Sequence, residues 1–119
     1  MSFNQRLLAI VAVGCVFGAT ALQAQNIAGS ISGVIQDAQG AVVPGAKVTL
    51  TNEGQGAASA RTVMTSAEGT FVFSPVLAGK YTVTVEMMGF KKYEQSGITL
   101  DVSDRLGLPP IPLEVGLYG

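Results

Sequence analysis

The 119-residue sequence contains no histidine, no tryptophan and a single cysteine, Cys15. Without histidine, Ser-His and Cys-His nucleophile pairs and histidine-containing zinc sites are excluded. Only 13% of the residues are charged, and the formal net charge is −1. Because such a chain has no basic run of the kind that neutralises phosphates, we expect no nucleic-acid partner.

The first 24 residues differ in composition from the rest. Arg6 is the only charge among them, the stretch 7–21 is almost wholly apolar, and the segment ends in Ala-Leu-Gln-Ala, with small residues at 21 and 24. A basic start, a short apolar segment and a small-residue cleavage site are typical of a secretory signal peptide. About 15 apolar residues fall short of the roughly 20 that a membrane-spanning helix needs. We therefore predict a signal peptide over 1–24, cleaved after Ala24 or alternatively after Ala21, and an exported domain over 25–119.

Cys15 lies inside this apolar segment, in Ala-Val-Gly-Cys. The context is similar to a lipoprotein cleavage box, but Ala12 stands where such boxes usually have leucine. We predict that Cys15 is an ordinary apolar residue of the leader, so the mature chain has no cysteine. Thiolate catalysis and thiolate metal sites are then excluded, and stability must come from an apolar core.

Short runs of alternating apolar and polar residues follow from residue 30 onward, separated by Gly, Pro, Asn and Asp. A period of two indicates strands with one buried face. Seven such runs predict an all-β fold, a seven-stranded antiparallel β-sandwich. The expected strands are 30–36, 46–51, 60–65, 70–74, 80–87, 97–102 and 111–115. The expected core is Val48, Leu50, Phe71, Phe73, Tyr81, Val83, Val85, Ile98 and Leu100.

Turn residues mark the connections between these strands. Asp37–Gly40 and Ser66–Gly69 each combine a capping residue with a final glycine that tolerates positive φ, which predicts a tight turn. Pro44-Gly45 is expected to carry the chain from one sheet to the other. Pro75 is expected to end its strand, because it cannot donate to a ladder, and Gly79 to allow a tight hairpin.

Five segments together carry a family resemblance: Ile31-x-Gly33-x-Ile35-x-Asp37, Gly40-x-x-x-Pro44-Gly45-Ala46-x-Val48-x-Leu50, Glu68-Gly69-x-Phe71-x-Phe73, Leu77-x-x-Gly79-x-Tyr81-x-Val83-x-Val85 and Gly89-Phe90-x-x-Tyr93. In this order and spacing they resemble the carboxypeptidase regulatory-like family. The resemblance implies a prealbumin-like sandwich, related to the carbohydrate-binding-like fold. It also implies an accessory role, because the likeness is to the accessory domain of carboxypeptidases rather than to their catalytic domain.

The carboxylates are scattered over turns and outward strand positions, so no pair is placed for acid–base work. Asp101 and Asp104 offer oxygen ligands, but they lack the dense acidic spacing of a calcium loop. We therefore predict no enzyme activity, no catalytic residue, no cofactor and no metal site.

One short patch, Phe90-Lys91-Lys92-Tyr93, combines aromatic and basic side chains that can contact a partner; alternatively, Phe90 and Tyr93 close the end of the sandwich. The sheet edges and the loops 52–59 and 90–96 also offer polar groups to a protein or polysaccharide. The resemblance implies the N-terminal accessory domain, or a truncated form, of an Oar-like TonB-dependent outer-membrane receptor, placed in the periplasm or at the outer membrane. The alternative is a free-standing module that binds carbohydrate or the cell surface.

Overall fold

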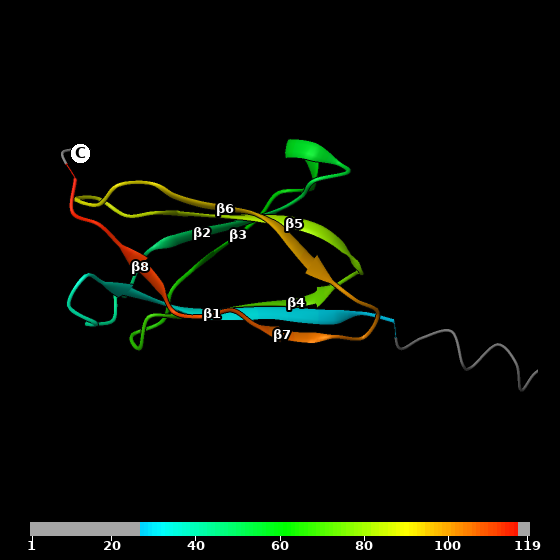
Figure 1. Ribbon diagram of the computed structural model, residues 1–119, viewed down its shortest axis with the longest axis horizontal. Coiled ribbons are helices and arrows are strands. Elements are labelled where there is room, and N and C mark those ends of the chain that lie inside the picture. The colour runs from blue at the N-terminus through cyan, green and yellow to red at the C-terminus, as the bar shows by residue number, and fades with distance from the viewer. Residues whose placement is uncertain (1–26, 117–119) are drawn as a thin grey trace, which may run out of the picture.

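The computed structural model describes residues 27–116, which form two four-stranded sheets packed face to face (Figure 1). In the first sheet β4 and β7 flank β1, and β8 also pairs with β1; the second sheet has the order β3-β2-β5-β6. The predicted signal peptide and Cys15 lie outside the described residues. Within residues 27–116, no helix is long and apolar enough to cross a membrane. The elements are β1 (Gly29–Asp37), β2 (Lys47–Asn52), the 3₁₀ helix η2 (Gly56–Ser59), β3 (Arg61–Met64), β4 (Thr70–Val76), β5 (Gly79–Glu86), β6 (Tyr93–Leu100), β7 (Arg105–Gly107) and β8 (Ile111–Leu113).

One apolar core fills the space between the sheets, and all nine residues predicted for it are buried. The alternation is clearest in β5, where Tyr81, Val83 and Val85 are buried while Lys80 and Glu86 are exposed. Packing of inward faces from two sheets is what a sandwich requires. The core also includes Ile31, Ile35, Val43, Ala46, Val76, Ile111 and Leu113.

The prediction of seven antiparallel strands is wrong in number and partly in direction. The additional strand is β7, and both β7 and β8 run parallel to β1. They occupy successive parts of the same edge of β1, with Leu108, Pro109 and Pro110 between them. A three-residue strand with one half-buried side chain, Leu106, has too few positions to show alternation, which explains why the sequence did not predict it.

Pro75 does not end β4 as expected, because the strand continues to Val76. The register shifts here: Ile31 pairs with Phe73, whereas Gly29 pairs with Val76. The proline therefore lies at a β-bulge, one of the few strand positions that tolerate it, and its peptide bond with Ser74 is cis. The hairpin expected at Gly79 is also absent, because β4 and the following β5 belong to different sheets.

A second bulge explains why β6 begins four residues before the predicted strand. Tyr81 pairs with Ile98 but Val83 pairs with Gln95, so Ser96 and Gly97 both lie opposite Thr82. Gly97 has φ of +72°, and the carboxylate of Glu53 accepts a hydrogen bond from its N–H at 2.8 Å. Because an extra residue reverses the inward and outward positions, a single alternating pattern cannot describe the whole of β6.

Both predicted tight turns are present. The carboxylate of Asp37 accepts hydrogen bonds from the N–H groups of Gln39 and Ala41 at 2.8 and 3.0 Å. Gly40 and Gly69 have φ of +85° and +75°. In the second turn, the N–H of Gly69 donates to the carbonyl oxygen of Ser66 at 2.9 Å.

The Pro44-Gly45 bend connects the two sheets as predicted, and a buried hydroxyl fixes it. Thr65 is the one buried polar residue of the described chain, with 6% of its surface exposed. Its hydroxyl donates to the carbonyl oxygen of Val43 at 2.7 Å and accepts from the N–H of Ala46 at 2.8 Å. One side chain thereby satisfies the two backbone groups that flank the bend, which an alternating pattern cannot reveal.

Thr65→Val should therefore lower the free energy of unfolding by about 2–3 kcal/mol, because it leaves a buried donor and a buried acceptor without partners. Thr65→Ser keeps the hydroxyl and should cost about 1 kcal/mol, the value of one lost methyl group. Urea denaturation of the two variants measures the difference. Equal losses would show that the hydroxyl contributes nothing to the bend.

Candidate functional site

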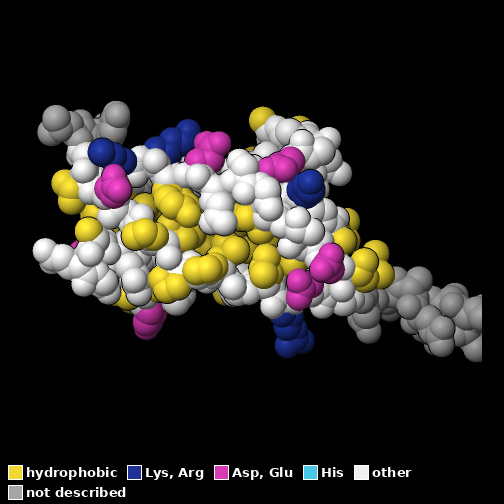
Figure 2. Space-filling view, in the orientation of Figure 1, with side chains coloured by type: hydrophobic (Ala, Val, Ile, Leu, Met, Phe, Trp, Pro, Cys, Tyr) yellow, Lys and Arg dark blue, Asp and Glu magenta, His cyan; other side chains and the backbone are white. Residues whose placement is uncertain are grey.

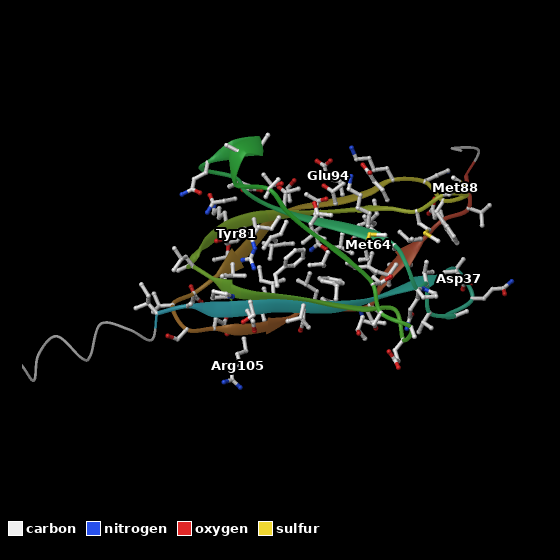
Figure 3. The ribbon with its side chains drawn as sticks, turned by 180° about the vertical axis from the view of Figure 1, so that it is seen from behind. Asp37, Met64, Tyr81, Met88, Glu94 and Arg105 are labelled. Carbon is white, nitrogen blue, oxygen red and sulfur yellow. The ribbon has the colours of Figure 1, made fainter. Side chains whose placement is uncertain are left out.

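An open groove of about 760 Å³ lies at the end of the second sheet where β2 begins and β5 ends. The apolar part comes from Met87, Met88 and Phe90. In Figure 3, Met88 lies at this end of the molecule, far from Tyr81 at the other end. The remaining residues that line the groove are Lys47, Glu86, Lys91 and Lys92.

The turn that follows β5 shapes the groove. The N–H of Phe90 donates to the carbonyl oxygen of Met87 at 3.0 Å, and Gly89 has φ of +87°. Phe90 also forms a β-bridge with Val115. The N–H of Gly116 donates to the carbonyl oxygen of Gly89 at 3.1 Å, so the end of the described chain lies beside the groove (Figure 1).

The structure brings three of the four residues of the predicted patch to this groove. Phe90, Lys91 and Lys92 line it, whereas Tyr93 does not. Phe90 and Tyr93 are both half-buried and pack against the core, which is the alternative that the sequence left open. Phe90 thus both lines the groove and packs against the core, and its contact with a partner stays a prediction.

Each lysine of the groove has an acidic neighbour. Nζ of Lys47 and Nζ of Lys92 lie 3.9 and 3.7 Å from the carboxylate of Glu86, on opposite oxygens. Lys91 pairs with Glu114 at 3.5 Å. These side chains are about half exposed or more, so each pair adds little stability. Three lysines against two glutamates leave one net positive charge at the rim, and Figure 2 shows basic and acidic side chains together at this end.

Sequence reasoning missed the part of the groove that comes from β2. Lys47 joins the site because it pairs with Glu86 across two strands. These residues are 39 positions apart, so only the register of the sheet brings them together. The loop expected over 90–96 is also shorter than predicted, because Tyr93 already belongs to β6.

The side chains at the groove suit contact with a partner. Among residues 27–116, no three acidic, cysteine or histidine side chains gather in a way that would hold a metal ion. Asp101 and Asp104 form a turn, in which the N–H of Asp104 donates to the carbonyl oxygen of Asp101 at 3.1 Å. An apolar surface with a charged rim is typical of surfaces that contact another molecule.

The fold is a two-sheet β-sandwich. Residues 30–113 match the model of the carboxypeptidase regulatory-like domain, and the chain belongs to this family of non-catalytic domains. No curated protein matches the chain.

Several solved structures share the sandwich. A chain from a cohesin–X-dockerin complex of Acetivibrio cellulolyticus is 22% identical with a TM-score of 0.55, covering 74% of this chain and 58% of that one. The Bacillus anthracis TIE protein is 19% identical with a TM-score of 0.62, covering 75% of this chain and 17% of that one. A catechol 1,2-dioxygenase of Acinetobacter is 11% identical with a TM-score of 0.62, covering 78% and 54%. At these identities the likeness is one of fold, and this chain spans only part of each protein.

Proposed function

We propose that the chain is an exported, non-catalytic module that serves as the N-terminal accessory domain, or a truncated form, of a TonB-dependent outer-membrane receptor. Membership of the regulatory-like family is the observation that supports this most directly. The composition of residues 1–24, typical of a signal peptide, favours a position in the periplasm or at the outer membrane.

The groove supplies the contact that this role needs. Met88, at the wall of the groove, is 79% exposed. A partner that covers this apolar side chain removes it from water, which favours binding. Gly116, the last residue that the structure describes, lies beside the same groove. The similar structure from Acetivibrio cellulolyticus is that of a cohesin–X-dockerin complex, which is compatible with a sandwich used for protein contacts.

A photo-crosslinking amino acid in place of Lys91 tests the proposal in the native cell envelope. We expect a covalent adduct in the outer-membrane fraction that mass spectrometry identifies as a TonB-dependent receptor polypeptide. The same spectra should show a mature N-terminus at Gln25. Lys91 suits this purpose because its side chain is 58% exposed at the groove and makes only a weak ion pair.

The matched control places the crosslinker at Lys80, an exposed lysine at the other end of the second sheet. This position should give no receptor adduct. Equal adducts at both positions, adducts with periplasmic soluble proteins alone, or an intact N-terminus at Met1 would contradict the proposal. Retention of the purified protein on a polysaccharide with no receptor adduct would favour the carbohydrate-binding alternative.

A further inference from the structure

A second cavity, of about 300 Å³, lies at the opposite end of the second sheet from the groove. It opens between β3 and β4, the edge strands of the two sheets, and Tyr81 marks this end in Figure 3. The loop that carries η2 contributes polar side chains, and the connection from β4 to β5 contributes apolar ones. The lining residues are Leu50, Asn52, Gln55, Ser59, Arg61, Pro75, Val76, Leu77, Ala78 and Tyr81.

Hydrogen bonds hold the polar side of this cavity in place. Oγ of Ser59 accepts from the N–H of Asn52 at 3.0 Å and donates to the carbonyl oxygen of Gly56 at 2.7 Å. Oδ1 of Asn52 accepts from the N–H of Gly54 at 2.9 Å. The loop between β2 and β3 is therefore preorganised, which lowers the entropy cost of binding a ligand.

Arg61 gives the cavity a positive charge. Its guanidinium lies 5.8 Å from the ring centre of Phe73 and donates to the carbonyl oxygens of Ser74 and Pro75. Within residues 27–116, Arg61 has no carboxylate partner, and none of the residues that line the cavity is acidic. Two of the five N–H donors of an arginine are thus committed, while the charge has no counterion from the described protein.

Neutral hydrogen-bonding groups lie around this charge. Nδ2 of Asn52 and the side-chain amide of Gln55 make no hydrogen bond with other described residues. The hydroxyl of Tyr81 donates to the carbonyl oxygen of Leu77 at 2.7 Å, which leaves its oxygen able to accept. The ring of Pro75 and the side chain of Leu77 add apolar surface. A cavity of this kind has one charged contact, several neutral polar contacts and an apolar wall.

We propose that this cavity binds one sugar residue that carries a carboxylate, such as a uronic acid of an acidic polysaccharide. The carboxylate would pair with Arg61, the hydroxyls would meet Asn52 and Gln55, and the carbon face of the ring would rest against Pro75. A volume of about 300 Å³ is at the lower end of ligand cavities, enough for one ring rather than an extended segment. The inference is independent of the proposed receptor role, because the groove of that role lies at the other end of the sheet.

Titration of the ¹⁵N-labelled protein with glucuronate, followed by NMR, tests this inference. Amide shifts should move in residues 52–61 and 76–81 and stay unchanged in residues 86–92. Glucose lacks the carboxylate, and its affinity should be lower by at least about tenfold, since a charged hydrogen bond contributes more than a neutral one. N-acetylalanine supplies a carboxylate without the sugar ring and should also bind more weakly than glucuronate.

Two variants locate the site, and a third serves as the control. Arg61→Gln should lower the affinity for glucuronate about tenfold or more, provided that its amide spectrum shows an intact fold. Gln55→Glu leaves Arg61 and its contacts with β4 unchanged. It adds a negative charge that repels the carboxylate of glucuronate, so it should also weaken binding. Lys80→Gln removes a nearby exposed charge that does not line the cavity and should leave the affinity unchanged.

Four results would overturn the inference. They are the absence of shifts with glucuronate, equal affinity for glucose, stronger binding of N-acetylalanine, and an unchanged affinity of Gln55→Glu. Failure of the receptor crosslink at Lys91 would leave this titration unaffected, so the two proposals can fail separately.

Discussion

Phe73→Ala should lower the free energy of unfolding by about 3–5 kcal/mol, the usual cost of removing a large buried side chain. Phe73 is 1% exposed and lies on β4 between the two sheets. Its ring packs edge-on against that of Phe71, with 5.9 Å between the centroids and an interplanar angle of 61°. The substitution therefore removes apolar burial and an aromatic pair, and it also removes the surface beneath the Arg61 guanidinium.

The matched control is Val72→Ala, one position earlier on the same strand. Val72 is 58% exposed and points away from the core, so its truncation should cost less than about 1 kcal/mol. Guanidinium denaturation of both variants gives the two free energies. Losses of similar size would mean that the inward and outward faces of β4 are assigned incorrectly.

Gly69→Ala should cost about 3 kcal/mol, although it adds only one methyl group. Gly69 has φ of +75°, where an L-residue is disfavoured by about 1–2 kcal/mol. The added Cβ would also lie 2.8 Å from the carbonyl oxygen of Ile35 and 3.1 Å from the nitrogen of Val43. These two atoms are hydrogen-bonded to each other at 2.9 Å, so the methyl group displaces the junction of β1 with the following bend.

Gly40→Ala separates the two contributions. Gly40 also has a positive φ, of +85°, but an added Cβ would meet nothing within 4 Å. It should therefore show only the backbone term of about 1–2 kcal/mol. Thermal or urea unfolding of both variants measures the difference, and equal destabilisation would show that the contact with Ile35 is easily relieved.

Alternation predicted the part of the fold in which each strand follows one pattern from end to end. The nine expected core residues are all buried because they lie on β2, on β5, or on the parts of β4 and β6 that the bulges do not interrupt. The errors occur where the pattern is interrupted or too short: the bulge at Gly97, the bulge at Pro75 and the three residues of β7. A bulge depends on the pairing of two strands, so a single strand read alone does not contain it.

The candidate sites were less predictable than the core, because they depend on pairing between distant strands. The Phe90-to-Tyr93 segment indicated one side of the groove from its composition alone. Lys47 and Glu86 complete the groove only through the register of β2 with β5. Sequence analysis did not single out Arg61, because its contacts with Ser74 and Pro75 require the two sheets to be in place.

The parallel pairing of β7 and β8 with β1 has a consequence for the order in which the chain folds. Ser30 pairs with Arg105, 75 positions later, and Ile35 pairs with Ile111. Contacts of such long sequence separation slow folding, because the chain loses the entropy of closing a long loop before the contact stabilises it. The segments up to Gly107 and then Leu113 must be available before this edge of β1 is paired, so one side of the first strand stays unpaired until almost the whole sandwich is in place.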